Sequence, residues 1–153
     1  MAFYYADSSA LVKRHVAETG SAWFTTLADP SAHNTIITAQ ISLVELYSAL
    51  NRRIRERTLT QADYALVMID LDLIFNSQYA IVPLSQTVIG ETRGLLERHP
   101  LRAYDAAQLA SAIYSRSEMK AAGASPLVFL SADTRLLTAA QAEGFDTDDP
   151  NLH

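Results

Sequence analysis

Residues 3–9 of the chain read Phe-Tyr-Tyr-Ala-Asp-Ser-Ser, a short apolar segment that ends on an acidic residue. The aromatic residues of 3–6 favour a buried strand. The segment from Ser8 to about Ala17 favours a helix with Ser8 or Ser9 near its N-cap, and Gly20 closes this region. The chain therefore begins with a strand that leads directly into a helix, with Asp7 at the junction.

Short apolar segments alternate with longer helical patterns along the rest of the chain. Residues 60–63, Thr-Gln-Ala-Asp, resemble a capping box that starts a helix. This alternation favours an α/β fold, in which a parallel sheet is covered by helices on both faces. Further strands are expected at 34–38, 79–84, 127–130 and 145–147, and further helices at 21–28, 41–57, 60–76, 86–98, 101–117 and 134–143.

The composition limits the classes of protein to which the chain can belong. With 153 residues it suits a single domain spanning 1–153, and the absence of cysteine excludes disulfides and thiol chemistry. No apolar run is long enough to cross a membrane and no export signal is visible, so a cytoplasmic protein is expected. The net charge of -5 excludes a broad basic surface for nucleic acid. Any binding of nucleic acid would need a local basic strip, a metal ion, or both.

Two aspartates, Asp7 and Asp133, stand just past expected core strands, where α/β proteins keep their functional groups. Each can be explained as a helix N-cap, because Asp accepts hydrogen bonds from free backbone amides at that position. If their two strands are neighbours in a parallel sheet, however, both carboxylates should point into the same crevice.

Two more acids, Glu45 and Asp105, lie inside expected helices that are otherwise mostly apolar. Glu45 shares a polar line with Ser42 and Ser48, and a buried Glu is costly unless it is paired or binds a metal. Asp105 forms a similar polar line with Gln108 and Ser111 in a helix rich in Ala and Leu. Contact with water would explain Glu45, and the helix dipole would explain Asp105, without any functional role.

Taken together, the four acids indicate a metal site. Four carboxylates in one pocket repel one another and would not all stay ionised without cations. Hard oxygen ligands suit Mg²⁺ or Mn²⁺, and such an ion positions phosphate oxygens and lowers the pKa of a bound water. The predicted metal ligands and catalytic groups are Asp7, Glu45, Asp105 and Asp133.

The chain resembles the PIN-domain nucleases, and specifically the VapC-type toxins of bacterial and archaeal toxin–antitoxin pairs. The resemblance covers essentially the whole chain and implies an α/β/α sandwich around a central parallel sheet of four to five strands. Four motifs carry it in order: Tyr-Ala-Asp-Ser-Ser-Ala-Leu-Val-Lys at 5–13, Ser-Leu-Val-Glu-Leu at 42–46, Tyr-Asp-Ala-Ala-Gln-Leu-Ala at 104–110, and Leu-Ser-Ala-Asp-Thr-Arg-Leu at 130–136.

This resemblance also implies an activity, namely Mg²⁺- or Mn²⁺-assisted hydrolysis of phosphodiester bonds in single-stranded or structured RNA. Asp7 and Asp105 match the positions most directly associated with metal binding. Glu45 matches a further ligand or water-positioning base, and Asp133 a ligand or an orienting residue. The implied partners are the RNA substrate, a cognate VapB-type antitoxin and a second copy of the chain. Two serines are expected to support the acids by hydrogen bonds: Ser9 and Ser131.

Local basic residues are needed if an acidic protein is to hold RNA. Lys13, Arg14 and Arg102 are the stronger candidates, because they stand near the acid motifs in the sequence. The arginines within 52–57 could also contact phosphates, although the favourable end of a helix explains them without a partner. None of the four histidines is expected to be catalytic, since they are scattered and share no motif: His15, His33, His99 and His153.

A PIN-like binding module or scaffold without catalytic activity is the alternative function. Apolar helices such as 60–76, or the tyrosines at 4, 47 and 104, could provide a face for an antitoxin or a second copy. Packing into the core is the commoner reason for such stripes. A dehalogenase-type phosphatase is disfavoured because Ser9 replaces its second acid, and the chain has no glycine-rich nucleotide loop and no Gly-x-Ser-x-Gly motif.

Overall fold

The protein is described by a computed structural model that covers residues 1–124 and 126–153. Within these residues, five strands form one parallel sheet in the order β3-β2-β1-β4-β5. The strands are β1 (Phe3–Ala6), β2 (Thr35–Ala39), β3 (Tyr79–Val82), β4 (Leu127–Leu130) and β5 (Asp146–Asp148). The helices are α1 (Ser8–Leu11), α2 (Ser21–Leu27), α3 (Ile41–Arg55), α4 (Gln61–Gln78), α5 (Gln86–Arg98), α6 (Ala103–Ala121) and α7 (Thr134–Ala142).

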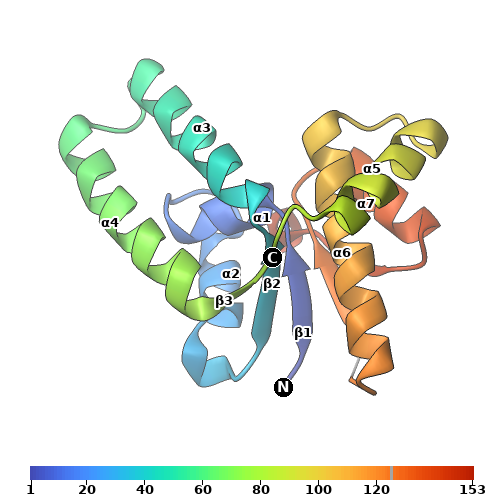
Figure 1. Ribbon diagram of the computed structural model, residues 1–153. Helices are drawn as coiled ribbons and strands as arrows, with labels where there is room; N and C mark the ends of the chain where they lie inside the picture. The colour runs from blue at the N-terminus through green and yellow to red at the C-terminus, as the bar shows by residue number, and fades with distance from the viewer. Residues whose placement is uncertain (125) are drawn as a thin grey trace.

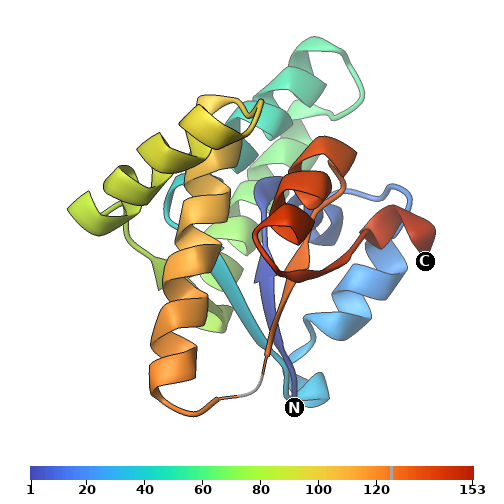
Figure 2. The same cartoon turned by 90° about the vertical axis from the view of Figure 1, so that its right-hand side faces the viewer.

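Helices cover both faces of the sheet, so the predicted α/β/α sandwich is confirmed. One buried cluster packs α5, α6 and α7 against the sheet, and a second packs α1 to α4 against the other face. Figure 1 shows these two groups on opposite sides of the strands, and Figure 2 shows α5 and α6 lying over the sheet. Alternate residues of β1 serve the two layers: Tyr5 faces the first cluster and Ala6 the second.

The chain passes from β1 to β2 and β3 on one side, and returns to place β4 and β5 on the other side of β1. The strand order therefore reverses between β1 and β4, although all strands stay parallel. The carboxyl ends of these two strands flank the crevice in which α/β proteins bind ligands. Asp7 and Asp133 follow those two strands. The two strands are neighbours in the sheet, as the sequence argument required.

The first helix is shorter than predicted. α1 ends at Leu11, and residues 12–14 form a 3₁₀ turn instead of continuing the helix to Ala17. The tighter turn accompanies the burial of Lys13, which is 3% exposed. Its ammonium donates to Glu18 Oε1 at 3.0 Å, to the Thr19 carbonyl at 2.7 Å and to Asn151 Oδ1 at 2.7 Å. Lys13 thus ties the first helical segment to the C-terminal turn.

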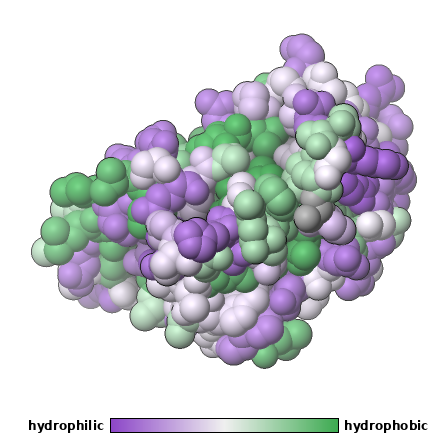
Figure 3. All heavy atoms as spheres, turned by 90° about the horizontal axis from the view of Figure 1, so that it is seen from below, coloured by the Kyte–Doolittle hydropathy of each residue, from purple (hydrophilic) through white to green (hydrophobic). Residues whose placement is uncertain are grey.

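The helix predicted from residue 60 is present as α4, and Thr60 caps it by accepting a hydrogen bond from the Asp63 amide. Its apolar residues do not all enter the core. Three of them, Leu66, Ile69 and Leu73, are 67%, 70% and 65% exposed. The expectation that this apolar stripe packs into the core is therefore wrong at these positions. Hydrophobic side chains reach the surface at the left edge of Figure 3, on the side where α4 lies in Figure 1.

Within the described residues, no helix has the length and apolar character that a membrane span requires.

Candidate active site

Asp7 lies at the carboxyl end of β1 and is held from three directions. The side chain is 4% exposed. Its Oδ1 accepts hydrogen bonds from the Ser9 hydroxyl at 2.7 Å and the Ala10 amide at 3.0 Å, and its Oδ2 accepts from the Ser131 hydroxyl at 2.8 Å. Asp7 is therefore both the N-cap of α1 and a buried carboxylate fixed in one orientation. Ser9 and Ser131 make the hydrogen bonds expected of them.

The same two serines join the ends of β1 and β4. Ser9 Oγ accepts from the Ala132 amide at 2.8 Å, and Ser131 Oγ accepts from the Asp133 amide at 3.0 Å. The Asp7 amide also donates to the Leu130 carbonyl at 3.2 Å. The loop that carries Asp133 is thus fastened to the loop that carries Asp7.

Glu45 projects from α3 and is anchored by Gln108 of α6. The Gln108 amide donates to Glu45 Oε1 at 2.7 Å and to Ser42 Oγ at 2.8 Å. Its carbonyl oxygen accepts from the Tyr5 hydroxyl at 2.7 Å. Because an ionised Glu45 carboxylate can only accept, the Gln108 amide nitrogen must face Glu45, and the Gln108 carbonyl oxygen is left to accept from Tyr5. Gln108 is 1% exposed, so this anchor is a buried part of the core.

Gln108 was visible in the sequence as a member of the polar line that starts at Asp105, but no role could be assigned to it. The structure explains the line. Gln108 turns inward to hold Glu45, while Ser111 donates to the Ala107 carbonyl four residues before it. Of the three residues in this line, only Asp105, in the first turn of α6, is partly exposed.

Asp105 and Asp133 complete the acidic group. Asp133 caps α7, because its Oδ1 accepts from the Arg135 amide at 2.9 Å. The expectation that Asp133 is a helix N-cap is therefore correct. A second role is compatible with it, since burial raises the pKa of Asp105 and the Asp133 charge adds to that rise.

The electrostatics of the site disfavour ionised carboxylates. Burial raises the pKa of Asp7 to about 6, with a smaller contribution from the Glu45 charge, although hydrogen bonds from Ser9, Ser131 and Ala10 oppose the shift. Burial also raises the pKa of Glu45 and of Asp105, and the Asp105 charge adds to the shift of Glu45. The charge of Glu45 thus acts on Asp7, that of Asp105 on Glu45, and that of Asp133 on Asp105, each as a smaller contribution than burial.

The carboxylate oxygens of these acids suit a hard divalent cation that keeps part of its water shell. Among the described residues, no three acidic or histidine side chains stand together as a preformed metal cage. Mg²⁺ does not need one, because it usually keeps several waters and takes one or two carboxylates together with substrate phosphates. Carboxylates whose mutual repulsion raises their pKa also gain from a cation that offsets it.

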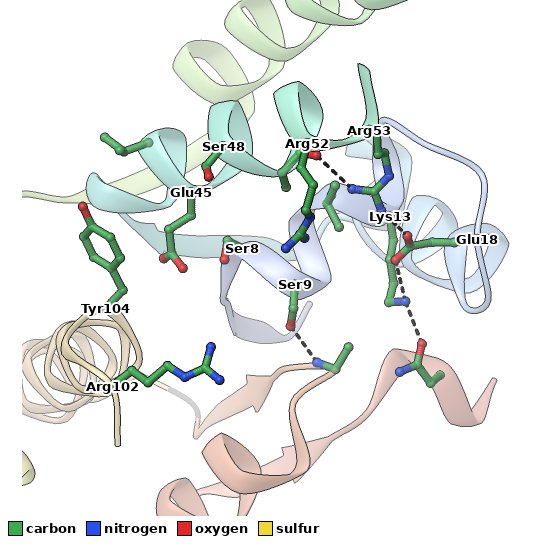
Figure 4. A pocket seen from close by; sticks show the side chains of 15 residues that line it. Ser8, Ser9, Lys13, Glu18, Glu45, Ser48, Arg52, Arg53, Arg102 and Tyr104 are labelled. Atoms are coloured by element: carbon green, nitrogen blue, oxygen red, sulfur yellow. Dashed lines mark hydrogen bonds and ion pairs between the residues drawn. The ribbon is translucent and has the colours of Figure 1, made fainter. Parts of the chain in front are cut away.

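One of the four predicted acids, Glu45, lines a pocket of about 630 Å³, whereas Asp7, Asp105 and Asp133 are not among its described lining residues. Glu45, Ser8 and Ser9 line it beside Arg52 of α3 and Arg102, which directly precedes α6. Figure 4 shows the Glu45 carboxylate and both guanidinium groups directed into this pocket. No histidine is among the described residues that line this pocket.

Two of the basic residues favoured by the sequence are engaged elsewhere. Lys13 lines the pocket, but its ammonium is buried and already donates to three oxygens. Arg14 points to another side of the molecule, where it donates to Gln78 and Tyr79. Arg52 lines the pocket in their place, whereas the sequence had left it open between a phosphate contact and the end of a helix. The relevant signal is its spacing of seven residues from Glu45, which puts both on one face of α3.

Comparison with known proteins agrees with this geometry. The family model for the PIN domain matches residues 4–142. Ribonuclease VapC45 and Ribonuclease VapC49, both of Mycobacterium tuberculosis, are each 33% identical over 147 residues, covering 94% of this chain and 93% of the relative.

Two solved structures share the fold. VapBC2 from Rickettsia felis, bound to a DNA fragment from its promoter, aligns with a TM-score of 0.61 at 18% identity, over 97% of this chain and 98% of that chain. A toxin–antitoxin complex from Klebsiella pneumoniae aligns with a TM-score of 0.60 at 16% identity, over 96% of this chain and 97% of that chain. On the sequence matches and the shared fold, the chain belongs to the PIN domain family and is of the VapC ribonuclease type.

Proposed function

We propose that the protein is a divalent-metal-dependent endoribonuclease that acts as the toxin of a toxin–antitoxin pair. The observation that carries this proposal is a pocket that presents the Glu45 carboxylate together with the guanidinium groups of Arg52 and Arg102, close to the buried Asp7 at the end of β1. Acids suited to a metal and cations suited to phosphate are the two requirements for cleaving an RNA backbone at this position. The names of the relatives at 33% identity support the same activity.

The residues of the chain have distinct parts in this reaction. Asp7, Glu45, Asp105 and Asp133 would hold Mg²⁺ or Mn²⁺, and such an ion supplies charge for phosphate oxygens and a lowered pKa for water. Asp7 is fixed for this purpose by its serines, and Glu45 by Gln108. With one oxygen of Glu45 held by Gln108, the partly exposed carboxylate faces the pocket, where it can orient a water or accept its proton.

We further propose that a VapB-type protein binds this chain and that the chain forms a homodimer. The structural neighbours support the first point, because both are complexes that contain an antitoxin. The exposed apolar residues of α4 support it as well, since a row of large apolar side chains facing water is typical of an interaction surface.

The test of the activity is RNA cleavage by the purified protein, freed of any bound partner. Incubation of total RNA with Mg²⁺ or Mn²⁺ should give discrete cleavage products, and an excess of EDTA should abolish them. Restoring the metal should restore the products. Cleavage that persists in EDTA would contradict metal dependence, and a protein that cleaves no RNA under any of these conditions would instead be a PIN-like binding module.

Replacing Gln108 by Leu is expected to slow cleavage by about 10–100-fold, the usual cost of losing a group that holds a metal ligand in place. The variant loses the hydrogen bond to Glu45 but keeps a side chain of similar size. Ser115→Ala is the matched control, because it removes another buried hydrogen bond of α6 that does not reach an acid. Single-turnover rates would be compared at equal folded fraction. An equal loss in both variants would contradict a specific role for Gln108.

A further inference from the structure

A chain of buried hydrogen bonds stands where α3 leaves the sheet. It begins at the carbonyl of Ala6, the last residue of β1, which accepts from the Thr38 hydroxyl of β2 at 2.7 Å. Thr38 Oγ1 is 2.8 Å from Ser42 Oγ in the first turn of α3, and Ser42 Oγ is 2.8 Å from the amide nitrogen of Gln108. The same nitrogen donates to Glu45 at 2.7 Å. The chain therefore joins the end of β1 to the carboxylate of α3.

The direction of each hydrogen bond in this chain is determined. A carbonyl can only accept, so the Thr38 hydroxyl uses its one hydrogen on Ala6 and must accept from Ser42. The Ser42 hydrogen is then used as well, and its oxygen accepts from the Gln108 amide. The two amide hydrogens of Gln108 thus serve Ser42 and Glu45. Reversing any one of these bonds would set two donors or two acceptors against each other.

The chain lies in the interior, and its hydroxyls are not the usual ones of a buried helix. Thr38 and Ser42 are both 0% exposed. The buried serines of α6, Ser111 and Ser115, donate to a carbonyl one turn back in their own helix. Ser42 instead bonds the side chains of a strand and of another helix. A fully paired network of this kind holds its members in one arrangement, because a buried polar group that loses its partner is costly.

The position of the chain determines what it can hold. Figure 1 shows α3 extending away from the carboxyl end of β2, so a small tilt or rotation at its base would move the rest of the helix. Glu45 follows Ser42 by three residues, which puts both on one face of α3, one turn apart. Thr38 ties that first turn to β2, which pairs directly with β1. Asp7 follows β1, so the chain fixes the two acids relative to each other.

We infer that Thr38 and Ser42 are positioning residues of the active site, which hold Glu45 in place relative to Asp7. Without the Thr38 hydroxyl, the Ser42 hydroxyl turns to a carbonyl of its own helix, as helical serines do, and its oxygen moves away from Gln108. The Gln108 amide then loses one of its two acceptors, and its hold on Glu45 is weakened. The inference rests on the proposed function, to which it adds two residues that do not touch metal or RNA.

Mn²⁺ binding tests the inference with a pair of variants that have opposite expectations. Thr38→Val removes the hydroxyl and keeps a branched side chain, whereas Thr38→Ser keeps the hydroxyl and removes a methyl group. A positioning hydroxyl predicts about 10-fold weaker Mn²⁺ binding for Thr38→Val and for Ser42→Ala, and parent affinity for Thr38→Ser. A side chain that only fills the core predicts the reverse order for the two Thr38 variants.

The Mn²⁺ affinity would be measured without RNA, by the electron paramagnetic resonance signal of the free ion, on protein freed of any partner. Thermal unfolding would give the folded fraction of each variant. Thr92→Val is the matched control, because its hydroxyl donates to the Val88 carbonyl of its own helix and it is not among the described residues of the pocket. The control should bind Mn²⁺ as the parent does.

Exchange of the Gln108 side-chain amide hydrogens with water, followed by NMR in EDTA, tests the chain without the metal. Exchange should be faster in Thr38→Val and Ser42→Ala than in the parent, and unchanged in Thr38→Ser. Parent-like exchange in Thr38→Val, or Mn²⁺ affinities in the order of a core-filling residue, would overturn the inference. If the parent binds no Mn²⁺ and cleaves no RNA while exchange responds as expected, the proposed function falls and the positioning of Glu45 stands. If the parent binds Mn²⁺ and cleaves RNA while neither measurement responds to Thr38→Val, the inference falls alone.

Discussion

Replacing Asp105 by Asn is expected to lower the rate of RNA cleavage by at least about 10³-fold. This exceeds the ~10–100-fold typical of residues that only support a metal ligand, because Asp105 belongs to the acidic group itself. The substitution keeps the size of the side chain and removes its charge. Since Asp105 is only partly buried and its pKa is raised by burial and by Asp133, the fold should tolerate the loss of charge.

The matched control for this prediction is Asp146→Asn, which removes one negative charge from an exposed position on β5. Single-turnover cleavage in Mg²⁺ would be measured for both variants and the parent, with thermal unfolding as a check of the fold. The control should cleave at the parent rate. A loss of less than 10-fold for Asp105→Asn, or a comparable loss for the control, would show that the acid is not part of the reacting group.

Asp7→Asn is expected to remove a proposed metal ligand and yet to raise the stability of the metal-free protein at neutral and higher pH. The pKa of Asp7 is raised from the usual value of 3.8 to about 6 in the folded protein. A raised pKa means that the protonated acid is favoured in the fold. Its stabilising contribution is therefore complete below pH 3.8 and is lost as the pH rises through 6. That loss is on the order of 3 kcal/mol, from 1.36 kcal/mol for each pKa unit.

Asn avoids this loss because it stays neutral at every pH. Its carbonyl oxygen can still accept from Ser9 and Ala10, and its amide can donate to Ser131. In EDTA at pH 8, Asp7→Asn should therefore have a higher free energy of unfolding than the parent, whereas at pH 4 the two should differ little. Urea unfolding at both pH values measures this. A variant that is less stable at pH 8 would show that the ionised carboxylate stabilises the fold.

The two predictions together indicate what stabilises the charge of the buried acids. Under the proposed function, a bound cation and not the fold would stabilise the charge of a buried carboxylate that weakens the metal-free protein at neutral pH. The same argument applies in weaker form to Glu45 and Asp105, since burial raises both of their pKa values. Mg²⁺ should accordingly stabilise the parent protein more than Asp7→Asn or Asp105→Asn.

Much of the fold could be predicted because its signals are local. The segments 86–98 and 127–130 have the predicted bounds of α5 and β4, and Thr60 caps α4 as its sequence indicates. The position of the acidic site followed from one general property of parallel sheets, namely that strand ends meet at the same edge. That inference needed β1 and β4 to be neighbours, which local patterns do not determine and the pairing of residues 3–6 with 127–130 shows.

The parts that could not be predicted depend on contacts between distant segments. Lys13 stands next to an acid motif in sequence, yet it is buried because Asn151, at the other end of the chain, supplies one of its acceptors. Gln108 holds Glu45 across 63 positions. The exposed row on α4 has the spacing of a core stripe, and only the packing of Leu71 and Phe75 on the other side of the helix shows which face is buried.

The central claim is that Asp7, Glu45, Asp105 and Asp133 bind a divalent metal ion. Anomalous X-ray diffraction from a crystal of the protein soaked in Mn²⁺ tests it most directly. The account predicts a manganese peak within ~2.0–2.3 Å of carboxylate oxygens from one or two of these residues, with waters completing the coordination. No peak at these acids in a fully soaked crystal, or a peak only at other residues, would contradict it.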